Sequence, residues 1–470
     1  MQGWAAAIAE QVRNGERRAV DIVAATCETI VTRDAAINSF TAHTFERALR
    51  EAEAVDAAHR LGQPLGPLAG VPYAVKNLFD VEGLTTLSGG RINAFNPNAS
   101  ADGVLVERMH AAGAVLVGAL NMDEHAYGFT TENTHYGPTR NPHDTTRISG
   151  GSSGGSGAAV AARLVPITLG SDTNGSIRVP SSLCGVFGLK PTWGRLSRRG
   201  SYPFVHSLDH LGPFASGVDD LALAYDALQF TDVEDPACAQ RPFEATTPFT
   251  AVPAGARVAC LDGWFADWAS PAAQRAVDRV ARALGSTARV TFAAAERSRA
   301  AAFIITGAEG GSLHRQRLAT HYDEYEPLSR DRLVAGSLIP SSWVVQAQKV
   351  RLAAYHDAMR LFDDWDLLIA PATPVSAPPI GTESLTINGK TVPARASMGI
   401  LAQPLSCIGL PVCTVPLWPH DAGDADAHLP IGVQLIAPPW REDRCLAAAR
   451  ALEVAGVAQC REPRRTMDMA

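Results

Sequence analysis

Apolar segments that look like buried strands follow helix-like segments repeatedly along this chain, and this order restricts the fold more than any other feature. Residues 104–122 read as a helix that ends at a glycine, followed by an apolar, β-branched strand. Residues 155–170 and 361–372 repeat the same order. Strands that alternate with helices form a parallel or mixed sheet with helices on both faces. The sequence therefore predicts an α/β fold.

Strand candidates occur in both halves of the 470-residue chain, which favours one large domain over a series of small ones. We expect a single domain over residues 1–470, with N-terminal helices at 1–62. Its sheet core and catalytic motifs are expected at 67–230 and 365–460. Residues 232–340 carry helical patterns and fewer strand signals, and we expect them to form a mainly helical insertion or cap.

The charge balance disfavours some classes of partner. The chain has 41 Lys and Arg against 48 Asp and Glu, a formal net charge of -7. Nucleic-acid binding depends on a concentrated basic face, which this balance does not favour. No run of 18 apolar residues is present, and the N-terminal residues read as an amphipathic helix. We expect a soluble cytoplasmic protein that binds neither nucleic acid nor membrane.

Cysteine and histidine give no sign of a metal centre. The eight cysteines are scattered, without a C-x-x-C pair, and the 13 histidines include no H-E-x-x-H motif. Such cysteines are expected to be reduced and buried. We therefore expect no metal and disfavour a zinc or iron hydrolase.

The run GGSSGGSG at residues 150–157 has almost no side chains, and such a composition is most often a flexible linker. A linker here would cut through the densest part of the predicted sheet, because helix and strand candidates continue on both sides. The run lacks the spacing of the common phosphate-binding motifs. It matches the G-x-S-x-G nucleophile elbow, but a polar segment precedes it instead of a strand. We expect the run to bring backbone and small side chains close to a ligand.

A second glycine-containing turn, GSDTNGSIRVP at residues 170–180, directly follows an apolar strand candidate. Consecutive backbone N–H groups on a tight turn of small residues can converge on one point, as an oxyanion requires. Ser176, at the end of the turn, would lie against that point. Upstream, Lys76 is the single lysine in the apolar run VPYAVKNLF. Taken alone, Lys76 is better explained as a strand-end lysine that reaches water.

Three motifs in this order resemble the amidase signature family of serine hydrolases: PLAGVPYAVKNLFDVEG, GGSSGGSGAAVAA and GSDTNGSIRVPSSLCGVFGLKPT. The later segments APATP and LPIGVQLIAPPW add to the resemblance, which spans residues 67–440. The resemblance implies one α/β/α domain around a large, twisted mixed sheet, in agreement with the alternation of helical and strand-like segments.

The resemblance also implies a Ser-Ser-Lys catalytic triad with Ser176 as the nucleophile, Ser152 as the proton relay and Lys76 as the base. A non-proline cis peptide bond near Ser152 is implied as well. No metal or organic cofactor is required. The oxyanion hole is expected to consist of the backbone N–H groups of Thr173, Asn174, Gly175 and Ser176.

This chemistry makes a physical demand on Lys76. A serine hydroxyl is a weak nucleophile until a base takes its proton, and a lysine accepts a proton only when it is neutral. Lowering the pKa of Lys76 from about 10.4 to near 7 needs about 4 to 5 kcal/mol of destabilisation of its charged form. Burial in an apolar strand has the right sign. We therefore expect Lys76 to be buried.

Asn174 departs from the family pattern, in which two glycines precede the nucleophile. Asn tolerates left-handed backbone angles better than most residues, so the turn can keep its shape; alternatively, the Asn174 side chain points at the substrate. Other expected substrate contacts are Tyr127 and Thr131, which lie in a loop rich in aromatic and hydroxyl groups. For Arg178, a substrate contact competes with a structural ion pair behind the active site.

Within the family, residues 121–144 and 195–213 resemble enzymes that hydrolyse the terminal amide of a small carboxylated urea and release ammonia. A carboxylated substrate needs a cationic pocket residue, and Arg140, Arg178 and Arg195 are candidates that the sequence does not rank. The resemblance also implies a small helical partner subunit, like the C subunit of tRNA amidotransferases, and an oligomer.

Two other functions stay open at this point. One is the glutaminase component of a glutamine-dependent aminoacyl-tRNA amidotransferase, its A subunit, which would release ammonia from glutamine. The other is a catalytically inactive scaffold that uses the fold for binding. A binding protein, however, has no need of Lys76, Ser152 and Ser176 together.

Overall fold

The computed structural model describes residues 3–247, 249, 255–419 and 426–463, so both ends of the predicted 1–470 domain lie outside the described residues. The helices are α1 (Trp4–Arg13), α2 (Ala19–Arg33), α3 (Phe45–Arg60), α4 (Val104–Ala111), α5 (Gly154–Ala161), α6 (Arg178–Cys184), α7 (Val218–Leu228), α8 (Trp264–Asp267), α9 (Pro271–Ala283), α10 (Ala295–His321), α11 (Arg330–Ser337), α12 (Ser341–Asp364), α13 (Ala394–Ser397), α14 (Gln403–Cys407) and α15 (Glu442–Val454). The strands are β1 (Phe40–His43), β2 (Pro72–Lys76), β3 (Val115–Leu120), β4 (Glu132–Asn133), β5 (Gly137–Pro138), β6 (Arg140–Asn141), β7 (Asp144–Ile148), β8 (Ile167–Asp172), β9 (Phe187–Lys190), β10 (His210–Ala215), β11 (Val258–Asp262), β12 (Arg289–Thr291), β13 (Leu367–Pro371), β14 (Ser384–Ile387), β15 (Lys390–Pro393), β16 (Val412–Leu417) and β17 (Ile431–Ile436). Short 3-10 helices are η1 (Asp34–Ala36), η2 (Arg91–Phe95), η3 (Glu124–Ala126) and η4 (Tyr322–Glu324).

Among the described residues, eleven strands form one mixed sheet in the order β1-β3-β2-β8-β10-β9-β16-β17-β13-β11-β12. β2 pairs in parallel with both β3 and β8, whereas the middle of the sheet is antiparallel. Every residue of β2, β3 and β8 is buried, which explains why these segments are nearly continuously apolar instead of alternating. Because β2 and β8 are parallel neighbours, their carboxyl ends lie at the same edge of the sheet.

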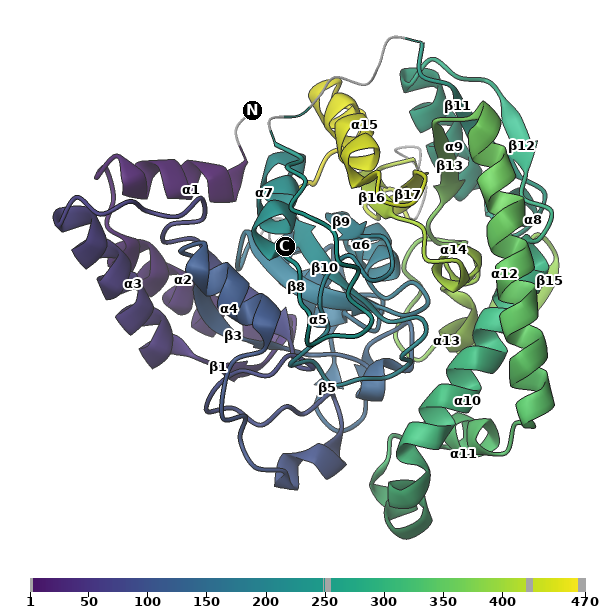
Figure 1. Ribbon diagram of the computed structural model, residues 1–470, viewed down its shortest axis with the longest axis horizontal. Helices are drawn as coiled ribbons and strands as arrows, with labels where there is room; N and C mark the ends of the chain where they lie inside the picture. The colour runs from purple at the N-terminus through teal and green to yellow at the C-terminus, as the bar shows by residue number, and fades with distance from the viewer. Residues whose placement is uncertain (1–2, 248, 250–254, 420–425, 464–470) are drawn as a thin grey trace.

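Helices cover both faces of this sheet. α5 and α6 pack on the central strands from one side, and α7 and α15 pack from the other, with α1 and α4 against α7 (Figure 1). The sequence of α5, GGSGAAVA, has only small side chains apart from one valine, so the helix lies close to β8 and β2. The predicted α/β architecture with helices on both faces is confirmed.

Three strands of the sheet lie where the sequence pattern indicated helices. β1 lies in the N-terminal segment 1–62, between α2 and α3. β11 and β12 lie in the segment 232–340, which also contains α8 to α11. All three are at or next to a sheet edge and have three to five residues. Such short strands owe their extended form to their neighbours more than to their own pattern.

The two long helices α10 and α12 run side by side along one side of the molecule, where they are green in Figure 1. α10 also packs against α11 and α14. This helical layer brings residues from 295–364 next to the carboxyl ends of β2 and β8, which are more than 100 residues earlier in the chain.

The amphipathic pattern at the N-terminus corresponds to α1, which buries Ala5, Ile8, Ala9 and Val12. Its first N–H groups are capped from a distant helix, since Asp220 of α7 accepts hydrogen bonds from Ala5 N and Ala6 N at 3.0 Å each. In the described part of the chain, no helix is both long enough and apolar enough to cross a bilayer.

Candidate active site

Lys76 is the last residue of β2, and its side chain is fully buried. Its Nζ donates hydrogen bonds to Ser152 Oγ at 2.6 Å and to Ser171 Oγ at 2.9 Å. Ser171 belongs to β8, the parallel neighbour of β2, which explains why the two side chains meet. The structure thus brings Lys76 and Ser152 together. It adds Ser171, which lies inside the motif GSDTNGS but was not singled out from the sequence.

Burial lowers the pKa of Lys76 to about 7, from an ordinary value of 10.5. The carboxylates of Asp123, Asp172 and Asp209 act in the opposite direction, because their negative charge stabilises the ammonium form. A substantial share of Lys76 is therefore uncharged at neutral pH. An uncharged lysine can accept a proton from a serine hydroxyl.

The loop that carries Ser152 is tightly packed. The peptide bond between Gly151 and Ser152 is cis, as the family resemblance implied. Asp123 N donates a hydrogen bond to Ser152 O at 3.2 Å. A Cβ at Gly155 would lie 2.6 Å from a backbone oxygen of the strand end beside it, which no real side chain tolerates. The glycines of this run therefore permit a close approach of backbone, which no linker requires.

Ser153, the other candidate serine of the run, is bound to the main chain of β8. Its Oγ donates a hydrogen bond to Ser171 O at 3.1 Å and accepts one from Ser171 N at 3.3 Å. Both contacts fix the end of β8, beside the lysine. The geometry therefore pairs Lys76 with Ser152 and gives Ser153 a structural position.

Asp172 ends β8 and shapes the turn at residues 173–177. Its Oδ1 accepts a hydrogen bond from Gly175 N at 2.7 Å, and its Oδ2 accepts one from Ile177 N at 3.2 Å. Gly175 has a φ of 136°, which favours glycine at that position. Asn174 does not have a positive φ, so the left-handed conformation considered for it from the sequence is not used.

These contacts change the predicted oxyanion hole. The Gly175 N–H points to the Asp172 carboxylate, which is a stronger acceptor than a neutral carbonyl, so this donor is occupied. The sequence could not reveal this competition because it depends on the turn geometry. In the described residues, no hydrogen bond uses the N–H groups of Thr173, Asn174 or Ser176. These three N–H groups remain as candidate donors.

Arg178 is fully buried, and its guanidinium is committed to the scaffold. Its Nε and Nη2 bind the two oxygens of Asp172 at 2.9 and 3.0 Å, while Nη1 donates to Ala402 O and Gln434 Oε1 at 2.9 and 2.8 Å. Burial alone would raise the pKa of Asp172, but the charge and hydrogen bonds of Arg178 hold that pKa well below its ordinary value. The structural ion pair, and not the substrate contact, is what the geometry favours for Arg178.

A small cavity of about 20 Å³ borders Ser176. Tyr127 lines this cavity, in agreement with a substrate contact, whereas Thr131 does not. The Thr131 Oγ1 accepts a hydrogen bond from Gly154 N at 3.1 Å, so Thr131 supports the relay loop instead. A cavity of this size holds roughly one water molecule, and a substrate must displace side chains at its rim. The lining residues are Ala126, Tyr127, Gly128, Phe129, Thr173, Asn174, Ser176, Phe204, Phe303, Thr306, Arg332 and Gln403.

Arg332 of α11 lines the same cavity, and sequence reasoning missed it. Its guanidinium lies over the ring of Tyr127, 3.8 Å from the ring centroid. Burial lowers the pKa of Arg332, yet a guanidinium stays charged at neutral pH. No motif marks this arginine, because only the packing of α11 against α10 brings it near Ser176. Arg332 is thus a cation at the site.

The other arginines proposed from the sequence lie elsewhere. Arg140 is exposed and donates to Thr145 O at 2.9 Å. Arg195 is buried and donates to Tyr225 Oη at 3.3 Å and to Gln229 Oε1. Neither lines the cavity at Ser176.

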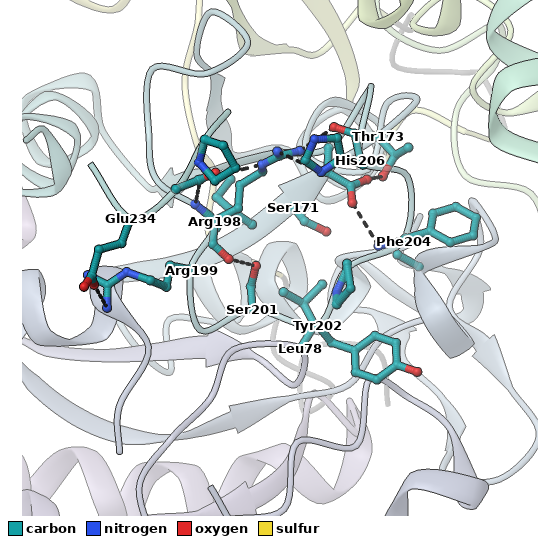
Figure 2. A pocket seen from close by; sticks show the side chains of 16 residues that line it. Leu78, Ser171, Thr173, Arg198, Arg199, Ser201, Tyr202, Phe204, His206 and Glu234 are labelled. Atoms are coloured by element: carbon teal, nitrogen blue, oxygen red, sulfur yellow. Dashed lines mark hydrogen bonds and ion pairs between the residues drawn. The ribbon is translucent and has the colours of Figure 1, made fainter. Parts of the chain in front are cut away.

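A larger cavity of about 240 Å³ lies on the other side of Thr173, and Figure 2 shows its lining. Ser171, which binds the buried lysine, lines this cavity together with Thr173. Asp209 fixes Thr173 by accepting a hydrogen bond from its Oγ1 at 2.6 Å. The Thr173 turn therefore separates a narrow space at Ser176 from a wider one beside Ser171.

The donor groups at this site are hydroxyls, one amine and backbone N–H groups. Within the described ranges, no cluster of three or more His, Cys, Asp or Glu side chains is arranged to hold a metal ion. The chemistry that these groups support directly is therefore nucleophilic attack by a serine with a lysine as base.

A buried lysine hydrogen-bonded to a serine, beside a glycine turn that ends in a second serine, is the arrangement of an amide-cleaving serine hydrolase. The Amidase family model matches residues 21–446, and the chain belongs to this family. The protein is therefore an amidase.

Among its relatives, the AtzE component of the 1-carboxybiuret hydrolase of Pseudomonas sp. (strain ADP) is 56% identical over 453 residues, which cover 96% of this chain and 98% of the relative. The glutaminase-type chain of the Glutamyl-tRNA(Gln) amidotransferase of Chloroflexus aggregans (strain MD-66 / DSM 9485) is 36% identical over 468 residues, or 93% of each chain. A solved structure described as an unexpected vestigial protein complex that reveals the evolutionary origins of an s-triazine catabolic enzyme superposes with a TM-score of 0.95 at 55% identity. It covers 98% of this chain and 100% of its own.

Proposed function

We propose that this amidase hydrolyses the terminal amide of 1-carboxybiuret, a small carboxylated urea, to urea-1,3-dicarboxylate and ammonia. The observation that carries the proposal is the buried hydrogen bond between Lys76 and Ser152, next to the turn that ends in Ser176. The 56% identity to a component of a 1-carboxybiuret hydrolase supports the choice of substrate.

The first step is attack by Ser176. Neutral Lys76 takes the proton of Ser152, and Ser152 takes the proton of Ser176 as Ser176 Oγ bonds to the terminal carbonyl carbon. The carbonyl oxygen then carries a negative charge. The N–H groups of Thr173, Asn174 and Ser176 stabilise this charge, each by roughly 3 to 4 kcal/mol.

The second step releases ammonia. The C–N bond breaks, and the leaving nitrogen takes a proton from Ser152, which is reprotonated by Lys76. The acyl group stays on Ser176 as a carbamate ester. A water molecule then gives its proton to the same relay and attacks the ester carbon. The bond to Ser176 breaks, and the dicarboxylate product leaves. The scheme requires no metal or organic cofactor.

Arg332 is the residue that we assign to the substrate carboxylate. It lines the cavity at Ser176 and presents a planar cation that matches a carboxylate. Tyr127, whose ring lies under the Arg332 guanidinium, closes the same wall. The carboxylate at one end and the reacting amide at the other would orient the substrate along the cavity.

Ammonia release from a panel of small amides tests this function. We expect turnover with 1-carboxybiuret to exceed that with biuret, allophanate, malonamide and glutamine, and Ser176→Ala and Ser152→Ala to lose it by at least about 1,000-fold. Ser153→Ala is the matched control and keeps turnover. Activity that survives in Ser176→Ala but disappears in Ser153→Ala would overturn the triad.

The glutaminase component of a glutamine-dependent amidotransferase is the second candidate, because a relative from such an enzyme is 36% identical over 93% of the chain. Such a component releases ammonia from glutamine. A turnover with glutamine that exceeds the turnover with 1-carboxybiuret would favour this second function over the first.

We also propose a cytoplasmic location and a small helical partner subunit within an oligomer. All eight cysteines are free, which supports a reducing compartment. Trp343, Val345 and Leu352 of α12 are 59%, 56% and 58% exposed, an apolar face that a partner would cover. Light scattering and turnover of the chain purified alone test the partner. A chain that is monodisperse, stable and fully active alone does not need one.

A further inference from the structure

Asn174 carries an unused hydrogen-bond acceptor at the site. The residue is only 7% exposed, and its side chain lines the same cavity as Ser176. Its Nδ2 donates a hydrogen bond to Thr306 Oγ1 at 2.8 Å. Its Oδ1 is buried and has no hydrogen-bond partner among the described residues. A buried acceptor without a partner destabilises a protein, so a group that binds there is expected to supply an N–H or O–H.

The Thr306 contact sets the orientation of this amide. Thr306 belongs to α10, is 3% exposed and also lines the cavity. Because the Nδ2 end of Asn174 binds the threonine hydroxyl, the Oδ1 end is left for the cavity. Asn174 itself stands between Thr173 and Gly175 in the turn that leads to Ser176. Its acceptor is therefore fixed beside the carbonyl that Ser176 attacks.

Two groups of a bound amide could meet this acceptor, and the arrangement of the site selects one. The leaving nitrogen must face Ser152 to receive its proton. The rest of the substrate extends into the cavity that Arg332 and Asn174 line. The atom bonded to the scissile carbonyl on that side is a nitrogen in a urea and a carbon in an ordinary carboxamide.

We propose that Asn174 Oδ1 accepts a hydrogen bond from the N–H next to the scissile carbonyl, and that Thr306 is the positioning residue that keeps the amide in this orientation. The inference rests on the proposed function and specifies its substrate class. The enzyme selects acyl ureas, which carry N–H at that position, over carboxamides with CH₂ there.

The selection has a physical basis. A site built to bind a polar substrate group discriminates strongly against an analogue that lacks it, because its own polar atom is then left unpaired. With CH₂ in place of N–H, Asn174 Oδ1 stays buried and unpaired in the complex. We expect this difference to alter kcat/KM by roughly 10- to 100-fold.

Biuret and malonamide provide a matched pair of probes, since they differ only by N–H against CH₂ between the two carbonyl groups. Their intrinsic reactivities differ, so the measured quantity is the ratio of their kcat/KM values, compared between the wild type and each variant. Should either compound not turn over, its competitive inhibition constant against 1-carboxybiuret hydrolysis supplies the same ratio.

Asn174→Ala is expected to lower the biuret-to-malonamide ratio by about 10-fold or more, mainly through loss of biuret. Thr306→Val should lower it in the same direction, and Thr306→Ser, which keeps the hydroxyl, should restore it. Thermal unfolding of each variant separates this effect from a loss of fold.

An unchanged ratio, with both probes reduced equally by Asn174→Ala, overturns the inference and leaves Asn174 with a role in the turn alone. A wild-type enzyme that favours malonamide overturns it too. The proposed function fails separately, if the wild type releases no ammonia from 1-carboxybiuret or if Ser176→Ala keeps its activity.

Discussion

Replacing Lys76 by methionine should abolish turnover and at the same time stabilise the folded chain. The pKa of Lys76 falls from 10.5 to about 7 on burial. Holding that pKa difference destabilises the fold by about 5 kcal/mol at pH values below 7. Methionine has a similar length and fills the same apolar space without a charge.

The substitution also removes the hydrogen bonds to Ser152 and Ser171. Each is worth about 1.5 kcal/mol. The net stabilisation below pH 7 is therefore about 2 kcal/mol. For a chain of this length, that corresponds to a rise of about 2 °C in the unfolding midpoint.

The pH dependence has a defined sign. The folded-state pKa of Lys76 is below its unfolded value, so between pH 7 and 10.5 the unfolded chain binds more protons than the folded chain. The wild type therefore gains stability from this group as the pH rises through that window. The advantage of Lys76→Met should be largest at pH 6.5 and should disappear toward pH 10, where only the lost hydrogen bonds remain.

Differential scanning calorimetry of both proteins at pH 6.5, 8 and 9.5, together with ammonia release, measures these effects. Turnover should fall by at least about 1,000-fold. Lys190→Met serves as the control for activity, because Lys190 is also buried with a pKa lowered to about 7 but binds only backbone oxygens. A Lys76→Met protein that is less stable than the wild type at pH 6.5, or that keeps its turnover, refutes the reasoning.

Three further results are expected. Arg332→Gln should lower kcat/KM for 1-carboxybiuret by about 10- to 100-fold with little change for biuret, which has no carboxylate; equal losses for both would remove Arg332 from the carboxylate site. Ser153→Ala should lower the unfolding free energy by about 1 kcal/mol, through its contacts to β8, yet keep turnover, whereas Ser152→Ala should lose turnover; the reverse pattern in ammonia release would make Ser153 the relay. Burial lowers the pKa of His314 to about 4 and that of the adjacent His125 well below its usual value, so stability present above pH 6.5 should be lost by about 3 kcal/mol for His314 alone as the pH falls toward 4. Thermal unfolding from pH 7 to 4.5 should show this loss, His314→Gln should reduce it, and an identical pH dependence in both proteins would contradict the assignment.

The central part of the fold could be predicted from the sequence because its segments are locally unambiguous. β2, β3 and β8 are continuous apolar runs, and the helices that precede or follow them have clear ends. The edge strands could not be predicted in the same way. β12 has only three residues, Arg289–Thr291, two of them exposed, and its extended form depends on pairing with β11.

The site shows the same division. Lys76, Ser152 and Ser176 stand in motifs, so their roles follow from the resemblance. Arg332 stands in no motif, because a single arginine on an exposed-looking helix has no pattern that points to a pocket. Thr306 is 132 residues from Asn174, and only the packing of α10 over the turn relates them. Contacts of that kind depend on tertiary structure and leave no trace in local sequence.

Several features that destabilise the chain lie together around the nucleophile. Lys76 is buried with a depressed pKa, Asn174 Oδ1 is buried without a partner among the described residues, and Asp172 is a buried charge that Arg178 must compensate. A chain under selection for stability alone would replace each by an apolar group at little loss of packing. Each also serves one step of the same reaction: Lys76 takes the proton, Asp172 shapes the oxyanion turn and Asn174 meets the substrate N–H. Their clustering at one sheet edge is therefore best explained by turnover, since the rest of the buried core satisfies the ordinary rules of packing and hydrogen bonding far more closely.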